Sequence, residues 1–250
     1  MIFLYVLGGL LGLLLLYILF LGTCALFVSP DKEYKNNSPF YRFLLDSATV
    51  PALWCTRVKI HVSGMEKVPV GKKVLFVSNH RSNFDPIITW RAFKKWKIAF
   101  ISKPSNFKIP FFGRIVRKCC FMAIDRENPR NAIVTINKAA KLLKRQEVSI
   151  GIYPEGTRSK ECKLLPFHNG VFKIAQKADA DMVVLTVRGT EKIHKNFPFQ
   201  RTHVYLDVLE IIPAGVVKST KTDELGARIR EEIEENLQRG NHNGKRNCIV

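Results

Sequence analysis

The sequence predicts an α/β fold: one domain with a central, mostly parallel or mixed sheet flanked by helices, preceded by an N-terminal membrane helix. After residue 57, short apolar runs typical of buried strands alternate with amphipathic segments typical of helices. The first 30 residues carry no charged side chain, so all 40 Lys and Arg and all 21 Asp and Glu lie beyond them. The apolar fraction of 46% suits a sizeable core and excludes a disordered chain, a collagen and a disulfide miniprotein.

Residues 1–28 are predicted to form a transmembrane helix. The run is dominated by Leu, Ile, Val and Phe and exceeds the roughly 20 residues that a membrane span needs. A cleaved signal peptide would need a positively charged segment before the run, and none is present. Lys32, Lys35 and Arg42 follow it, so the positive-inside rule predicts that the rest of the chain lies on the cytoplasmic side of the cytoplasmic membrane.

Residues 29–57 are predicted to be an interfacial or amphipathic linker. Its aromatic side chains, such as Phe40, Phe43 and Trp54, can rest in the membrane interface, or the segment can pack on the body as an ordinary helix. The sequence favours neither alternative. Pro51 is expected to interrupt any helix here.

The main domain is predicted to span residues 58–239. Strands are expected at 73–78, 98–102, 121–124, 148–153, 182–187 and 204–212, and helices at 86–97, 131–145, 170–178 and 222–238. The tail, 240–250, is expected to be flexible. In folds that alternate in this way, the functional groups lie in loops at strand ends.

The absence of several motifs narrows the possible chemistry. The six cysteines form no C-x-x-C pair, so we expect reduced thiols and no metal site. No G-x-S-x-G or G-x-G-x-x-G is present, which argues against an ordinary serine hydrolase and leaves a dinucleotide fold without its fingerprint. Gly151 and Gly156 have the spacing of a phosphate loop, but Thr157 stands where that motif needs Lys, which excludes a nucleotide hydrolase.

A possible acid–base pair follows the first predicted strand. His80 lies just past the strand, and Asp85 lies five residues later, before the proline that opens a helix. The chain must turn between them, so Asp85 can hold one ring nitrogen of His80 and leave the other free as a base. The alternative, that Asp85 caps the following helix, stays open at this point.

Cationic side chains form the second candidate site. Arg158 follows strand 148–153, where its guanidinium can bind a phosphate through two hydrogen bonds. Lys103 lies at another strand end and can meet a phosphate as a point charge, although an ordinary surface lysine is the alternative. The net charge of +19 predicts attraction to nucleic acid, anionic lipid or a phosphorylated substrate, without choosing among them.

These motifs, in this order, resemble the glycerolipid acyltransferases, and above all the 1-acyl-sn-glycerol-3-phosphate (lysophosphatidate) acyltransferases. The resemblance covers roughly residues 60–215 and rests on N-H-R-S-N-F-D at 79–85, the block from 103 to 126 and P-E-G-T-R-S at 154–159. It implies that His80 is the general base and that Asp85 orients it. A fatty acyl group would pass from acyl-CoA or acyl carrier protein to the free hydroxyl of lysophosphatidate, giving phosphatidate for phospholipid biosynthesis.

The resemblance also implies the substrate-binding residues and the partners. No cofactor and no acyl-enzyme are expected, and the partners would be an acyl thioester, lysophosphatidate and the bilayer. Arg158 would be the main phosphate ligand. The residues implied to bind substrate are Lys103, Arg126, Glu155, Gly156, Thr157 and Arg158.

The sequence departs from the family pattern at three places. Tyr153 replaces the more usual Phe before P-E-G, and His168 stands where Lys is frequent and is expected to line the site at most. The apolar run 181–187 lacks the proline of the family's fourth block, which leaves the preferred donor open.

Two alternatives remain. The same chemistry could act on another lyso-lipid, or the chain could be a membrane-tethered basic binding protein. A nucleic-acid partner is not expected, because no binding module and no interleaved aromatic and basic face is evident.

Overall fold

The central sheet of this computed structural model, which describes residues 1–159 and 163–242, has seven strands in the order β1-β7-β6-β2-β5-β3-β4. Every strand pair is parallel except β6–β7, so the predicted α/β fold with a mixed sheet is confirmed. The strands are β1 (Val58–Ser63), β2 (Leu75–Ser78), β3 (Ile98–Ser102), β4 (Met122–Ala123), β5 (Ser149–Ile152), β6 (Met182–Arg188) and β7 (Thr202–Ile212). The sequence prediction did not include β1, although its residues, V-K-I-H-V-S, alternate strictly between apolar and polar; β1 lies at the sheet edge.

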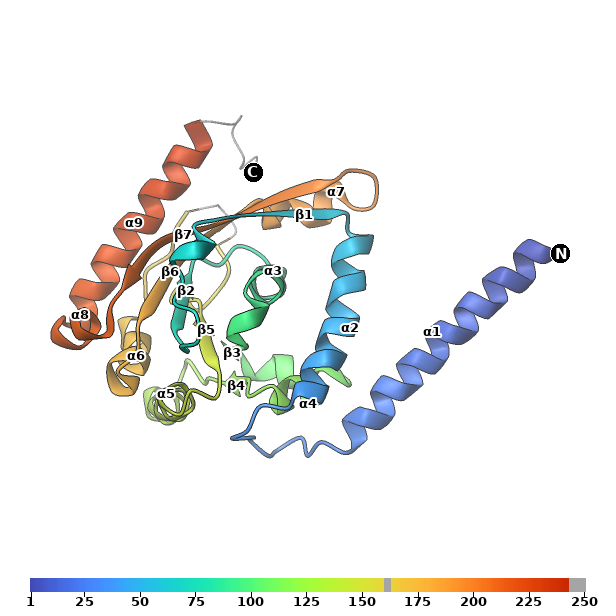
Figure 1. Ribbon diagram of the computed structural model, residues 1–250, viewed down its shortest axis with the longest axis horizontal. Helices are drawn as coiled ribbons and strands as arrows, with labels where there is room; N and C mark the ends of the chain where they lie inside the picture. Colours follow the sequence, from blue (N-terminus) through green and yellow to red (C-terminus); the bar gives the residue numbers. More distant parts are fainter. Residues whose placement is uncertain (160–162, 243–250) are drawn as a thin grey trace.

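Helices cover both faces of the sheet (Figure 1). Because successive strand residues point to opposite faces, Phe76 packs toward α3 while Leu75 and Val77 pack toward α5, α6 and α9. The helices are α1 (Ile2–Leu26), α2 (Pro39–Cys55), α3 (Asp85–Ala92), α4 (Phe112–Lys118), α5 (Pro129–Lys144), α6 (Lys173–Ala178), α7 (Ile193–Asn196), α8 (Ala214–Ser219) and α9 (Thr222–His242).

Two predicted helices differ in their ends. The helix expected at 86–97 ends at Ala92 and continues as a 3-10 turn, Lys94–Trp96, after which Lys97 adopts a left-handed conformation that stops it. The helix expected at 170–178 begins with another 3-10 turn, Asn169–Phe172. At the C-terminus, α9 continues to His242, and the rest of the expected tail, 243–250, lies outside the described residues.

Helix α1 leaves the body and points away from it (Figure 1). Its 25 residues correspond to about 38 Å at 1.5 Å per residue, which exceeds the roughly 30 Å hydrocarbon core of a bilayer. Among the described residues it is the one helix whose length and hydropathy suit a membrane span. Only its last turns dock, where the Tyr17 hydroxyl lies 2.8 Å from Ser47 Oγ and the Tyr41 hydroxyl donates to the Cys24 carbonyl.

The prediction that Pro51 interrupts a helix is wrong, because α2 runs through it from Pro39 to Cys55. A proline inside a helix costs about 3 kcal/mol. Buried side chains on both sides of it, Leu44 and Leu45 before and Leu53 after, offset that cost by packing on the body. The opposite face of α2 leaves Phe43 and Trp54 exposed, so one face packs and the other stays available to a membrane interface.

Candidate active site

The loops that carry the predicted site residues meet at one edge of the sheet. Strands β2, β3, β5 and β6 run parallel to their neighbours in this part of the sheet, so their carboxyl ends lie on the same side. The loop after β2 carries His80, the loop after β3 carries Lys103 and the loop after β5 carries residues 153–159. Segments up to 79 residues apart in sequence are thereby brought together, and the backbone N–H of Ser159 donates to the His80 carbonyl at 2.9 Å.

His80 and Asp85 form a hydrogen-bonded pair, with Nδ1 of His80 at 2.8 Å from Oδ2 of Asp85. The same carboxylate oxygen accepts hydrogen bonds from the backbone N–H groups of Arg81 and Ser82, at 2.6 and 2.7 Å. These donors belong to the loop before α3, so Asp85 does not cap the helix in the way the alternative interpretation supposed. Because Asp85 accepts the hydrogen bond from Nδ1 of His80, that ring nitrogen carries the proton. The other ring nitrogen, Nε2, keeps a free lone pair.

Tyr153 supports the His80 ring from one side. The two rings stack with centroids 4.3 Å apart and planes inclined by 19°, and Phe100 continues the stack on the far side of Tyr153. Burial raises the pKa of Tyr153 well above its ordinary value, so its phenol stays neutral. The replacement of Phe by Tyr at this position therefore keeps the aromatic support without adding a charge.

Glu155 is buried and does not line the cavity beside His80. Its Oε1 accepts the backbone N–H of His80 at 2.6 Å, and its Oε2 accepts the backbone N–H of Leu165 at 2.9 Å. Burial raises the pKa of Glu155, although the two backbone hydrogen bonds oppose that effect. The carboxylate of Glu155 therefore links the loop that carries His80 to the loop that carries Leu165. The resemblance implied a different role, a contact with the substrate.

Gly156 makes the tight turn after β5. Its φ of +70° is a left-handed conformation, and a Cβ there would come within 3.0 Å of the His168 ring. The His168 backbone is held by Pro154, which places this ring beside the turn, in an adjoining apolar cavity.

A cavity of about 420 Å³ opens beside His80. One part of its lining is cationic, with Lys103, Arg126 and Arg158. Among the described residues, none of these three forms an ion pair with a carboxylate. The remaining lining is largely apolar and includes Leu45 of α2 together with Ile87, Trp90, Phe107, Ile109, Phe112 and Val116. The arrangement suits a ligand with an anionic head and an apolar chain.

The turn before α5 holds the backbone around Arg126 in place. The Asp125 carboxylate accepts from the backbone N–H groups of Glu127 and Asn128 and from the Asn131 amide, which fixes the chain on either side of Arg126. Partial burial lowers the pKa of Arg126 from its very high ordinary value. An arginine in these surroundings remains a cation at neutral pH.

Among the described residues that line the cavity there is no cysteine, and its serine and threonine side chains are Thr49, Ser102 and Thr157. The described residues contain no cluster of three or more His, Cys, Asp or Glu side chains that could hold a metal ion. Burial raises the pKa of Cys119 to about 12 and that of Cys120 to about 11, so neither thiol ionises readily. Nε2 of His80 is the ring nitrogen that the pair with Asp85 leaves open beside the cavity.

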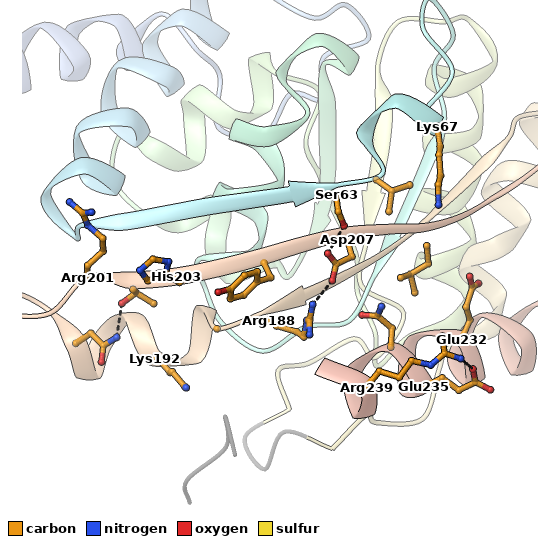
Figure 2. A pocket seen from close by; sticks show the side chains of 17 residues that line it. Ser63, Lys67, Arg188, Lys192, Arg201, His203, Asp207, Glu232, Glu235 and Arg239 are labelled. Carbon is orange, nitrogen blue, oxygen red and sulfur yellow. Dashed lines mark hydrogen bonds and ion pairs between the residues drawn. The ribbon is translucent and has the colours of Figure 1, made fainter. Parts of the chain in front are cut away.

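A larger groove, of about 1210 Å³, lies on the outer face of β1, β7 and β6 (Figure 2). Its charges are of both signs and include two ion pairs, Arg188 with Asp207 and Arg239 with Glu235. None of the residues predicted to bind substrate lines it.

Sequence reasoning missed one contact to the acid–base pair. The Thr190 hydroxyl, just after β6, donates to Oδ1 of Asp85 at 2.5 Å, and both side chains are fully buried. The two residues are 105 positions apart, so no local spacing indicates the contact.

Comparison with known proteins gives one consistent result. The family model named Acyltransferase matches residues 59–188, which is more than half of the chain. The 1-acyl-sn-glycerol-3-phosphate acyltransferase of Borreliella burgdorferi is 29% identical over 189 residues, covering 75% of this chain and 75% of that protein. The enzyme of the same name from Escherichia coli is 32% identical over 167 residues, covering 65% of this chain and 66% of that one.

A solved structure shares the fold. The crystal structure of the 1-acyl-sn-glycerophosphate acyltransferase PlsC from Thermotoga maritima aligns with a TM-score of 0.64 over 80% of each chain, at 22% identity. Together with the family match, the His80–Asp85 pair and the cationic cavity beside it lead to one conclusion: this chain belongs to the Acyltransferase family and is an acyltransferase.

Proposed function

We propose that this enzyme transfers a fatty acyl group from an acyl thioester, acyl-CoA or acyl carrier protein, to the free hydroxyl of lysophosphatidate, giving phosphatidate. The observation that carries the proposal is the hydrogen-bonded His80–Asp85 pair beside a cavity whose lining combines many apolar side chains with three cations that form no ion pair among the described residues. The names of the Borreliella and Escherichia relatives support the same acceptor.

The proton moves through His80. Nε2 takes the proton of the acceptor hydroxyl as its oxygen attacks the thioester carbonyl carbon, and the imidazolium that forms is stabilised by Asp85. The carbon–sulfur bond then breaks, and the departing thiolate takes the proton from Nε2, which restores neutral His80. An ester and a free thiol result, and no covalent enzyme intermediate is needed.

The acceptor phosphate would lie against Lys103, Arg126 and Arg158, because a phosphate dianion is best balanced by several donors of positive charge. Its acyl chain would extend along the apolar lining toward α2 and α4. The exposed apolar surface of α1 and the outer face of α2 support an association with the bilayer. The basic residues Lys32, Lys35 and Arg42 after the apolar run support a body on the cytoplasmic side. Thr157 and Gly156 would shape the cavity wall rather than carry charge.

The test uses the purified full chain in lipid vesicles, with labelled acyl-CoA or acyl carrier protein and a panel of lyso-lipids with and without a phosphomonoester. Phosphatidate is the expected product, and faster transfer to an acceptor without phosphate would overturn the assignment. His80→Ala should abolish transfer while the chain stays folded. The matched control is His61→Ala, because His61 lies on the outer sheet face and contacts His203 and Tyr205. Near-normal turnover by His80→Ala would refute the mechanism.

A further inference from the structure

Asp85 is held at both of its carboxylate oxygens, but by different parts of the chain. Oδ2 accepts from His80 and from the two backbone N–H groups of its own loop. Oδ1 accepts from Thr190 of the segment after β6. Asp85 and Thr190 are both 0% exposed, so water cannot replace that donor.

We propose that Thr190 is a positioning residue for acyl transfer, acting through Asp85 on the ring of His80. The inference rests on the proposed function only in that His80 is the base. It gives the segment that follows β6 a mechanistic role at the acceptor side of the reaction, beyond strand packing.

The Thr190 hydroxyl is held rigidly from the β6 side. The amide of Asn79, next to His80, bonds both the carbonyl and the N–H of Val187 at 3.0 and 2.8 Å, so the end of β6 is tied to the loop of the acid–base pair. Gly189, with φ of +90°, packs so tightly that a Cβ would lie 2.4 Å from the carbonyl oxygen of His203.

The residue before that glycine is fixed on the outer face of the sheet. Arg188 forms an ion pair of 2.5 Å with Asp207 of β7, and Asp207 also accepts from Ser63 of β1 at 2.6 Å, as Figure 2 shows. A continuous set of contacts therefore runs from the sheet edge to the acid–base pair. It leaves the hydroxyl of Thr190 little freedom relative to Asp85.

The chemical consequence follows from charge distribution. With Thr190 donating, the negative charge of Asp85 is stabilised at both oxygens. Without that donor, the negative charge concentrates on Oδ2, which holds the Nδ1 proton of His80 more strongly. The carboxylate also loses one of the contacts that fix its rotation, so Nε2 is less well aimed at the acceptor hydroxyl.

The test compares three variants of the full chain in vesicles. Thr190→Val removes the hydroxyl and keeps the shape, and Thr190→Ser restores a hydroxyl. The matched control is Thr186→Val, because Thr186 is also fully buried on β6 but donates to Asn236, away from the acid–base pair. Thr190→Val should lower kcat about 10- to 100-fold, the loss expected for one hydrogen bond to a charged group, with little change in KM. Thr190→Ser should recover most of kcat, and Thr186→Val should behave as wild type.

A second measurement separates this inference from the proposed function. The ring-nitrogen resonances of His80, followed by NMR in the chain labelled at histidine and assigned with His80→Ala, should shift in Thr190→Val and stay in place in Thr186→Val, whatever reaction the enzyme performs. If valine prevents folding, Thr190→Ala removes the same hydroxyl without adding bulk. Unchanged His80 resonances and unchanged kcat in these variants would overturn the inference, as would equal losses of kcat in Thr190→Val and Thr186→Val. Activity retained by His80→Ala would instead overturn the proposed function.

Discussion

Replacing Glu155 with Gln tests whether this carboxylate holds the site together or binds the substrate. Each of its two oxygens accepts one backbone N–H, from His80 and from Leu165. Glutamine has the same shape but only one acceptor oxygen, so its NH₂ group must face one of the two backbone donors. One charge-assisted hydrogen bond is lost, and a buried N–H is left without an acceptor.

The size of the effect can be worked from these contacts. A hydrogen bond to a charged group contributes roughly 1.5–3 kcal/mol, and a buried unpaired N–H costs about 1–3 kcal/mol. We expect Glu155→Gln to lower the free energy of unfolding by about 3 kcal/mol. For a chain of this length that corresponds to a fall in Tm of about 6–12 °C. The fraction that remains folded should also turn over more slowly, because the backbone of His80 loses its support.

The assay is a thermal melt and steady-state kinetics on the same vesicle preparations. The matched control is Glu147→Gln: Glu147 accepts a single backbone N–H, that of Asn37 at 2.7 Å, so the amide oxygen of glutamine can replace it. The control should melt within about 2 °C of wild type, since no donor is left unpaired. If Glu155→Gln melts like wild type and only raises the KM for the acceptor, Glu155 binds substrate and the structural interpretation is refuted.

Two further predictions concern charge. Arg158→Ala should raise the KM for the acceptor roughly 10- to 100-fold. Arg158→Lys should raise it less, because lysine keeps the charge but cannot form two parallel hydrogen bonds to the phosphate. A change confined to the KM for the thioester would contradict the assignment of Arg158 to the acceptor. At the outer groove, burial and then the neighbouring Glu210 raise the pKa of Glu232 from 4.5 to about 7. The folded state then keeps a proton that the unfolded state has released between these values, so stability falls as pH rises through that window. Glu232→Gln should therefore melt higher than wild type near pH 8 and equally near pH 4.5, and identical differences at both pH values would disprove this.

Local patterns were enough for several features. The spacing of His80 and Asp85 after a buried strand predicted an acid–base pair, because the chain has to turn within five residues and so brings the side chains together. The alternation of strands and helices predicted a mixed α/β sheet, since each apolar pattern reflects which face of an element is buried. The uncharged run from Met1 to Pro30 predicted a long exposed apolar helix.

Other features depended on contacts between distant segments. Pro51 argued for a break in α2, yet tertiary packing of Leu45 and Leu53 outweighed that local preference. Glu155 belongs to a motif that suggested a substrate ligand, and only the folded chain turns its carboxylate inward to two backbone donors.

The sequence by itself determined the chemistry: a histidine with its carboxylate, cations at strand ends and an apolar N-terminal segment, each of which is encoded within a few neighbouring residues. The tertiary structure alone decided how that chemistry is held. The register of β6 against β2 brings Thr190 to Asp85 across 105 residues, and this register is set by the packing of side chains throughout both faces of the sheet. No short stretch of sequence contains that information, because the free energy that fixes it is spread over the whole core.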